Sequence, residues 1–297
     1  MYKIFLKVGD GCNLQCSYCM QQHSPVSYKC NDEFILSLKK QYPDTIFCLL
    51  GGEPLLYKQT IKHIIDDLLF DVRINVVTNG KLLDEDWVSY FNERDNIKVI
   101  VSWDGKSSSY TRGYDVLKEN YTNLVKLKNL WISSLITNDS CIMDKCDILD
   151  KLNYDRHNIG MDETIPNIKL AYGIYYTRET IRKLSQELRQ IKCGLIDNRL
   201  SNLWYMQQKK IFDSTNKSQD LFCGANVFVL HYTISGEKRR CFFDDDLSNV
   251  EEPYINIIKD NCEMCEVKKI CMHQCPIKLD NMDNFCLACK TFYSYFI

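Results

Sequence analysis

Two patterns of apolar residues alternate along the first 191 residues of the chain. Short apolar runs predict buried strands, and segments with apolar residues three and four positions apart predict helices. The strands are predicted at residues 4–8, 45–50, 73–78, 97–103, 130–137 and 168–171. The helices are predicted at residues 31–41, 57–69, 84–92, 114–128, 144–152 and 177–191.

Strands that alternate with helices in this way are typical of parallel strands joined by right-handed crossovers. About six such units fit into the chain, two fewer than a closed eightfold barrel needs. We therefore predict an α/β fold, a partial (β/α)6 barrel. Further along, residues 227–234 alternate in apolar character as a hairpin strand does, and Gly236 supplies a turn.

Polar or glycine-rich segments follow four of the predicted strands. They comprise residues 12–19, 51–54, 78–80 and 102–105. In parallel barrels the functional site forms at the carboxyl ends of the strands. We therefore expect these four segments to meet at one edge of the sheet.

Composition and charge narrow the class of protein. The chain has 297 residues, of which 45% are hydrophobic, and this is enough for one large domain and one small one. A formal net charge of −2 gives no electrostatic case for nucleic-acid binding. The apolar stretch at the N-terminus is short and carries charges, which argues against a signal peptide or a membrane span. We expect a cytoplasmic protein, in which 16 cysteines favour metal or redox chemistry over disulfides.

The cysteines fall into two groups. Three lie in the loop after the first strand, and eight lie between Cys223 and Cys289. The other five are most simply small buried hydrophobic residues: Cys30, Cys48, Cys141, Cys146 and Cys193. Residues 214–220 have the composition of a linker, so we predict two domains, residues 1–213 and 214–297, each with a metal-binding region.

Cys12, Cys16 and Cys19 are close enough in sequence to share one metal centre. Thiolates are soft ligands that suit iron-sulfur clusters. Three thiolates leave one iron of a 4Fe-4S cubane open to a small molecule, as catalytic metal sites generally keep one position free. The alternatives are three incidental reduced thiols or a zinc site, for which His23 and Cys30 are the nearest possible fourth ligands.

The spacing C-x3-C-x2-C, with the aromatic residue Tyr18 before the last cysteine, resembles the signature of the radical S-adenosylmethionine (radical SAM) superfamily. The resemblance implies that S-adenosylmethionine chelates the open iron and that Tyr18 contacts its adenine through the backbone. It also implies that an electron from the cluster, supplied by a flavodoxin- or ferredoxin-type donor, cleaves the cofactor. The 5'-deoxyadenosyl radical then abstracts a hydrogen atom from the substrate.

Two further segments resemble motifs of this superfamily. Gly51-Gly52-Glu53-Pro54 resembles the GGEP motif, which implies that Gly51, Gly52 and Glu53 bind the cofactor's amino group. Glycine lets the backbone approach a ligand closely, and proline fixes the exit of the turn. Taken alone, this segment is compatible with a plain turn between a strand and a helix.

The segment Ser102-Trp103-Asp104-Gly105 resembles the S-x-D-G motif at the end of the fourth strand. The resemblance implies that Ser102 contacts the cofactor carboxylate and that Arg112 assists, although the spacing between them is short for the family. Thr78, at the end of the third strand, is a further candidate for contact with the cofactor. An ordinary solvated turn is the alternative for Ser102 and Arg112.

The cysteine-rich tail is similar to the SPASM extension of radical SAM enzymes that mature peptides and proteins. The similarity implies one auxiliary 4Fe-4S cluster on Cys223, Cys241 and Cys275, and a second on Cys262, Cys265, Cys271 and Cys286. Cys289 either completes the first cluster, substitutes for Cys286, or does neither. A zinc ribbon built from the two C-x2-C pairs of this tail, 20 residues apart, is the alternative, but it leaves the other four cysteines without a role.

Three enzymatic functions fit these motifs. The first is an enzyme that installs a cross-link in, or epimerises, a ribosomally made precursor peptide. Many such maturases begin with a leader-binding domain, and here the first strand starts at Tyr2, so we expect a separate leader-binding protein or direct binding by the core. An epimerase would need a thiol hydrogen donor, for which the candidates are Cys141, Cys146 and Cys193.

The second function is an anaerobic sulfatase-maturing enzyme, and the third is a dehydrogenase of a small molecule. The resemblance to sulfatase-maturing enzymes implies an acidic base directly after the residue equivalent to Cys241. Here Phe242 and Phe243 come first, and the acidic residues begin at Asp244. An electron carrier without enzymatic activity would leave the motifs at residues 51–54 and 102–105 without a purpose.

Overall fold

A single mixed sheet organises the computed structural model, which describes residues 2–19, 21, 24–170, 174–215, 229–239, 265 and 282–296. The strand order is β6-β5-β4-β3-β2-β1-β7-β8, and only β8 is antiparallel to its neighbour. This confirms the predicted α/β fold with parallel strands. The strands are β1 (Lys3–Lys7), β2 (Ile46–Leu50), β3 (Arg73–Thr78), β4 (Ile97–Ser102), β5 (Leu130–Leu135), β6 (Asn167–Lys169), β7 (Val229–Thr233) and β8 (Lys238–Arg239).

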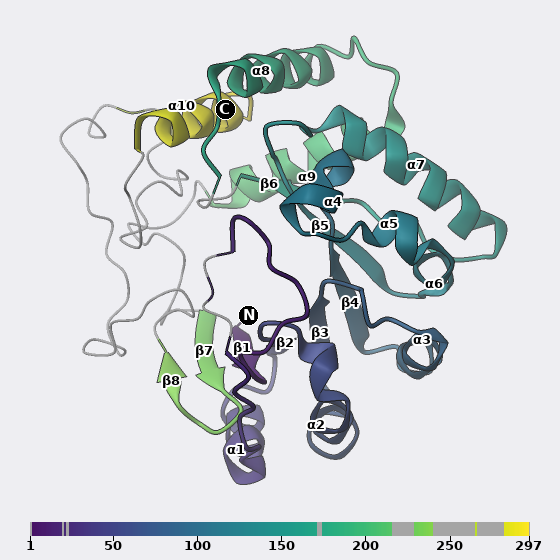
Figure 1. The fold of residues 1–297 in the computed structure, drawn as a ribbon, viewed down its shortest axis with the longest axis vertical. Helices are drawn as coiled ribbons and strands as arrows, with labels where there is room; N and C mark the ends of the chain where they lie inside the picture. Colours follow the sequence, from purple (N-terminus) through teal and green to yellow (C-terminus); the bar gives the residue numbers. More distant parts are fainter. Residues whose placement is uncertain are drawn as a thin grey trace.

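Helices follow the strands along the chain. In Figure 1 the helices α1, α2, α3, α6 and α7 line the outer side of the sheet, and α8 and α10 pack together at one end. The helices are α1 (Asp32–Gln41), α2 (Lys58–His63), α3 (Glu85–Asn92), α4 (Ser108–Thr111), α5 (Val116–Glu119), α6 (Tyr121–Lys126), α7 (Met143–Asn158), α8 (Arg178–Lys192), α9 (Arg199–Thr215) and α10 (Met282–Ser294). Two 3-10 turns (Pro54–Tyr57 and Gly105–Ser107) and a π-helical turn (Ile64–Leu68) complete the described helical segments. None of these helices is long and apolar enough to cross a bilayer.

The strands present two chemically different faces. Ile4, Leu6, Val99 and Ile132 belong to the fully buried core beneath the helices. Because side chains alternate along a strand, the residues between them point to the other side, which we call the inner face. Its residues are more accessible and include Lys3, Phe5, Lys7, Arg73, Asn75, Lys98, Ile100, Ser102, Trp131 and Lys169.

The predicted hairpin exists, and it extends the main sheet. Strands β7 and β8 are antiparallel and joined through Gly236, whose φ of 100° favours glycine. We did not predict that β7 would pair in parallel with β1, with Phe5 opposite His231. The boundary at residue 214 remains a prediction, but β7, which lies beyond it, shares the sheet of the first region.

Two predicted helices differ from the structure. The helix expected at residues 114–128 is split into α5 and α6, because Asn120 leaves helical geometry and its side chain donates hydrogen bonds to the carbonyls of Gly80 and Leu83 at 2.8 and 2.6 Å. The helix expected at residues 144–152 continues to Asn158. Helix α10 was not predicted.

Candidate functional site

The loop between β1 and Cys19, residues 9–19, is held from several sides. The Tyr57 hydroxyl accepts a hydrogen bond from the Gly11 amide at 2.9 Å and donates one to the Val26 carbonyl at 3.1 Å. Farther along the loop, the Ser17 amide donates to the Thr111 carbonyl at 2.8 Å. The loop that carries the three cysteines is therefore fixed by backbone and side-chain contacts within the protein.

Cys12, Cys16 and Cys19 lie within electrostatic reach of one another. Burial raises the pKa of Cys12, and the charges of Glu53 and Cys19 raise it further. Burial also raises the pKa of Cys16, where the Arg112 guanidinium opposes the effect and the two other thiols add to it. A positively charged metal centre would relieve this mutual penalty on the thiolates, so the three thiols fit an iron-sulfur cluster.

Gly51 and Gly52 pack directly against the cysteine loop. A Cβ atom on Gly51 would lie 2.5 Å from the Gly9 carbonyl oxygen, and one on Gly52 would lie 2.3 Å from that of Gly11. Hydrogen bonds from the Gly52 amide to the Gly9 carbonyl (3.1 Å) and from the Glu53 amide to the Gly11 carbonyl (2.8 Å) join the two segments. We expected these glycines to allow close approach to a ligand. The close approach in this structure is to the backbone of the cysteine loop.

The Glu53 carboxylate connects the ends of β2 and β3. It is 1% exposed and accepts hydrogen bonds from the Thr78 hydroxyl (2.7 Å), the Asn79 amide (2.7 Å) and the Leu55 amide (3.0 Å). Burial raises the pKa of Glu53, and these three donors act in the opposite direction. Glu53 and Thr78, both predicted to contact the cofactor, therefore contact each other.

Asn79 extends this connection to the cysteine loop, and only its place in a polar segment pointed to it. Its side-chain amide donates to Asn13 Oδ1 at 2.7 Å, and its own oxygen accepts from the Lys81 amide at 2.9 Å. Asn79 lies in a segment that we noted as polar, but neither Asn79 nor Asn13 was a predicted site residue. Their pairing depends on contacts between distant parts of the chain.

Asp104 is the second buried acid at this edge, and we did not predict its role. Its carboxylate is fully buried, accepts a hydrogen bond from Arg112 Nε at 2.7 Å and contacts the Tyr18 hydroxyl. Its other oxygen accepts from the Leu135 amide at 3.0 Å. Asp104 therefore joins the predicted cofactor residues Tyr18 and Arg112 to the ends of β4 and β5.

Arg112 also faces the cysteines. Its Nη1 atom lies 3.9 Å from Cys16 Sγ. Burial lowers the pKa of Arg112, but the charges of Asp104, Tyr18 and Cys16 outweigh burial and raise the pKa above its usual value. The guanidinium thus remains charged beside the thiols. The structure brings Arg112 to the cysteine loop despite its short spacing from Ser102.

A buried lysine supports the turn after Asp104. Lys145 is fully buried, and its ammonium donates to the carbonyl and hydroxyl oxygens of Ser140 at 2.7 and 2.6 Å. Burial lowers the pKa of Lys145 to about 8. A Cβ atom on Gly105, whose φ is 74°, would lie 2.0 Å from Ser140 Oγ. The glycine after Asp104 is therefore required by packing as well as by backbone conformation.

Ser102 is half-buried at the end of β4 and shares the inner face with Lys98 and Ile100. It thus lies beside the Asp104 turn, where β4 ends. Its contact with the cofactor remains a prediction.

Of the tail cysteines, Cys265, Cys286 and Cys289 lie within the described residues. Cys265 is half-buried, and Cys286 and Cys289 lie one turn apart on α10. Cys289 is fully buried in a core that also contains Trp204 and Phe292. The other predicted tail ligands lie outside the described residues: Cys223, Cys241, Cys262, Cys271 and Cys275.

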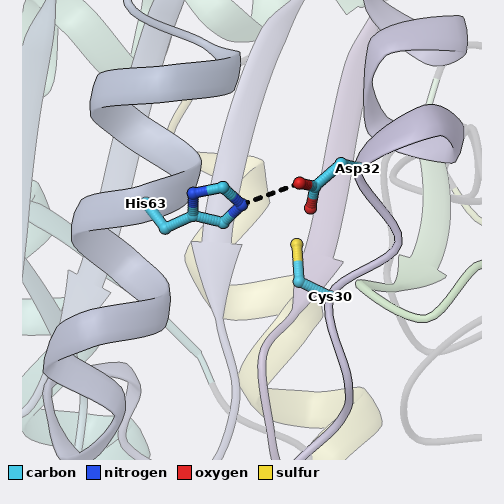
Figure 2. A group of neighbouring side chains, drawn as sticks. All are labelled: Cys30, Asp32 and His63. Carbon is cyan, nitrogen blue, oxygen red and sulfur yellow. Dashed lines mark hydrogen bonds and ion pairs between the residues drawn. The ribbon is translucent and has the colours of Figure 1, made fainter.

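The five cysteines outside the two groups differ in how far they are buried. Cys48, Cys141 and Cys146 are buried, as predicted, whereas Cys193 is exposed. Cys30 is half-buried beside Asp32 and His63, as Figure 2 shows, with the potential ligand atoms of the three residues within 4.8 Å of one another.

His63, at the end of α2, contacts two carboxylates: Asp32 of α1 and Asp67 of the π-helical turn that follows α2. Its Nε2 lies 3.0 Å from Asp32, and its Nδ1 lies 2.7 Å from Asp67. Hydrogen bonds to Asp32 and then Asp67 raise the pKa of His63, which favours an imidazolium that pairs with both acids. A protonated imidazole cannot bind a metal, so this group of residues is explained as an ion-pair network between two helices.

Comparison with known protein families gives a match for the part of the chain that forms the cysteine-loop edge. Residues 6–112 match the Radical SAM superfamily. This chain carries a radical SAM domain. The matched stretch contains the first three cysteines and every residue predicted to bind the cofactor, from Tyr18 to Arg112.

Comparison with individual proteins adds one relative and several structures. Over 62 residues the chain is 42% identical to 7-carboxy-7-deazaguanine synthase of Bacteroides thetaiotaomicron, a match that covers 21% of this chain and only 30% of that relative. Likeness of fold extends over more of the chain than this match. The structure of native anSMEcpe with bound AdoMet has a TM-score of 0.62 at 18% identity and covers 99% of this chain and 96% of its own.

Streptococcus suis SuiB bound to precursor peptide SuiA has a TM-score of 0.57 at 14% identity and covers 98% of this chain and 70% of its own. At these identities the likeness concerns the fold.

Proposed function

We propose that this radical SAM enzyme modifies a ribosomally synthesised peptide after translation. The observation that carries the proposal is the cysteine loop, which contacts of Glu53, Asn79 and Asp104 connect to the ends of four strands. Such preorganisation holds reacting groups in place at no cost during the reaction. The substrate class rests on the similarity of the cysteine-rich tail to the SPASM extension.

In this proposal Cys12, Cys16 and Cys19 hold a 4Fe-4S cluster, and S-adenosylmethionine binds at its open iron. The bound cofactor supplies a 5'-deoxyadenosyl radical that removes a hydrogen atom from the peptide. Three residues of the chain have supporting roles. Arg112 keeps positive charge beside the thiolates, and Asp104 and Glu53 hold the loops that position the cofactor and exclude water.

The tail supports the choice of a peptide substrate. We propose that residues 214–297 form a SPASM region with two auxiliary 4Fe-4S clusters on the cysteines named above. Likeness to SuiB, a protein crystallised with its precursor peptide, favours a peptide substrate. An electron donor of the flavodoxin or ferredoxin type and a leader-binding protein belong to the same proposal.

Maturation of a sulfatase is the second candidate. It is favoured by the extent of the likeness to anSMEcpe, an anaerobic sulfatase-maturing enzyme, which covers nearly all of both chains. It is disfavoured by Phe242 and Phe243, which stand where those enzymes are expected to place an acidic base. Modification of a ribosomally synthesised peptide therefore remains the preferred function.

Anaerobic reconstitution with iron and sulfide, followed by S-adenosylmethionine and a strong reductant, tests the radical chemistry. We expect 5'-deoxyadenosine and about twelve iron atoms per chain if three cubanes form. Failure to form 5'-deoxyadenosine would overturn the proposal. About four iron atoms per chain, or zinc bound by the tail, would overturn the auxiliary-cluster assignment alone.

Co-expression with short peptides encoded beside its gene tests the substrate class. Mass spectrometry is expected to show loss of two hydrogen atoms for a cross-link, or uptake of solvent deuterium without other mass change for epimerisation. Oxidation of a cysteine or serine to an aldehyde in a sulfatase peptide would instead support the second candidate.

A further inference from the structure

The strands that the structure describes carry charged side chains of one sign only. Across the eight strands there are seven basic residues and no aspartate or glutamate, although the whole chain has a net charge of −2. Five of the seven lie on the inner face: Lys3, Lys7, Arg73, Lys98 and Lys169.

The strand register brings several of these cations together. Lys3 is opposite Ile46, which is opposite Arg73 on the next strand, and Lys98 is opposite Asn75. Lys98 Nζ lies 3.6 Å from the centroid of the Trp131 ring, a side chain that is 39% exposed. The inner face therefore combines an exposed aromatic surface with clustered positive charge.

Electrostatic effects show that these cations interact. Burial lowers the pKa of Lys98, and the charges of Lys3 and Arg73 lower it further. Burial and the charge of Lys3 have the same effect on the pKa of Lys169. Lys3 is thus a common neighbour of Lys98 and Lys169, and all three raise the electrostatic potential of the same face.

Carboxylates neutralise some other cations of the described structure. Lys7 pairs with Asp10, and Arg94 pairs with Asp66 at 3.0 Å. Among the residues that the structure describes, no carboxylate lies within ion-pair distance of Lys3, Lys98 or Lys169. Like charges brought together without a counter-ion destabilise a fold, and a ligand of opposite charge would relieve that cost.

We infer that the inner face binds an acidic segment of the peptide substrate, with its carboxylates at Lys3, Lys98 and Lys169 and its chain against Trp131. The inference rests on the proposed function, because it assumes a peptide substrate. An acidic segment provides the complementary charge, and an extended chain can lie along the inner face.

The position of Ser102 relative to Lys98 predicts how far the acidic residue lies from the reacting residue of the peptide. Lys98 and Ser102 are four residues apart on the same face of β4, which corresponds to about 13 Å. An extended peptide with its reacting residue near Ser102 would therefore place an acidic side chain about four residues away at Lys98.

Binding of labelled octaglutamate to the reconstituted full-length protein with S-adenosylmethionine, measured by fluorescence anisotropy without reductant, tests the inference. We expect octaglutamate to bind and a neutral glycine-serine octapeptide not to bind. The double variant Lys98→Glu/Lys169→Glu should weaken octaglutamate binding at least about tenfold. Lys151→Glu, an equal charge change at an exposed position of α7, should leave binding unchanged.

Two further variants keep the test decisive. Lys98→Arg retains the charge and the contact with Trp131, and should bind octaglutamate within about twofold of wild type. If the double variant does not fold, Lys98→Gln is expected to weaken binding alone. Equal binding by Lys98→Gln and Lys151→Glu, or no preference of the wild type for octaglutamate, would overturn the inference.

The assay separates this inference from the proposed function. Octaglutamate binding is measured before any reductant is added, whereas formation of 5'-deoxyadenosine reports the radical chemistry. A wild-type protein that cleaves the cofactor but ignores octaglutamate would refute only the acidic-peptide inference.

Discussion

Positively charged side chains lie at two regions of the sheet, the cysteine-loop edge and the inner face, and their surroundings differ. At the cysteine-loop edge, Arg112 is 11% exposed in its side chain and pairs with the fully buried Asp104. On the inner face, Lys98 and Lys169 each lie within electrostatic reach of Lys3, and no carboxylate of the described residues lies within ion-pair distance of these three lysines. The positive charge of Arg112 is neutralised within the protein. The positive charges of the three lysines are available to a negatively charged ligand. In a scaffold that orients a cofactor, we expect charged groups to form their ion pairs within the protein. In a surface that recognises a ligand, we expect charged groups to be left to pair with that ligand.

The largest expected effect comes from destroying the cysteine-loop edge. Replacement of Cys12, Cys16 and Cys19 by alanine removes all three predicted ligands and should abolish formation of 5'-deoxyadenosine. The matched control is Cys193→Ala, because Cys193 is exposed and far along the chain. Cofactor cleavage that survives the triple replacement would show that the loop does not hold the catalytic cluster.

Removal of the Asp104 carboxylate would leave the cysteine-loop edge, like the inner face, with a cation that has no carboxylate partner. Asp104→Ala leaves the buried Arg112 guanidinium without its carboxylate and the Leu135 amide without its acceptor. We expect the free energy of unfolding in urea to fall by about 3–5 kcal/mol. Asp104→Asn, which can still accept from the Leu135 amide, should lose less. Equal losses for the two variants would mean that the charge of Asp104 has no role.

Gly52→Ala tests the contact between the turn after β2 and the cysteine loop. The added methyl group would meet backbone oxygen atoms that cannot move independently, and overpacking of this kind costs about 1–3 kcal/mol. Because the displaced segment is the cysteine loop, iron content after reconstitution should also fall. Gly160→Ala is the control: its φ is 75° and nothing lies within 4 Å of its Cβ position, so it should cost about 1–2 kcal/mol without loss of iron.

The smallest expected effect is a gain in stability on the inner face. Lys98→Met removes one of several like charges while retaining contact with Trp131, and should raise the free energy of unfolding by up to about 1 kcal/mol at neutral pH. Because the pKa of Lys98 is lowered in the folded state, the unfolded wild type binds more protons as the pH approaches 10.5. Wild-type stability at this site therefore rises with pH, and the advantage of the variant should shrink.

Urea unfolding of both proteins between pH 7 and pH 10 measures this difference. Other groups titrate in the same range, but they are common to the two proteins and cancel in the comparison. A loss of stability in Lys98→Met that does not change with pH would contradict the description of the inner face as electrostatically strained.

Sequence patterns predicted the elements well where the local signal was strong. Asn31, Asp84 and Thr177 each cap a helix with their side chains, and residues 73–78 form β3 with the predicted bounds. The signal failed at Asn120, because its side chain bonds to carbonyls about 40 residues away. Such a contact leaves no trace in the local spacing of apolar residues.

The candidate site shows the same division. Motif spacing identified the cysteines, Glu53 and Arg112 as candidates. It did not show that Asp104 joins Tyr18 to Arg112, or that Asn79 reaches Asn13, because those pairs meet only when the ends of separate strands are brought together.

The sequence by itself determined most of the strands and helices and the turns that end the strands, and it made the thiols of Cys12, Cys16 and Cys19 candidate metal ligands. Side-chain periodicity and thiol chemistry are local properties, so a single chain displays them. Only the tertiary structure decided which charges are neutralised and which face one another. That outcome depends on strand register and on the direction of side chains across crossovers, which set distances between residues far apart in the chain.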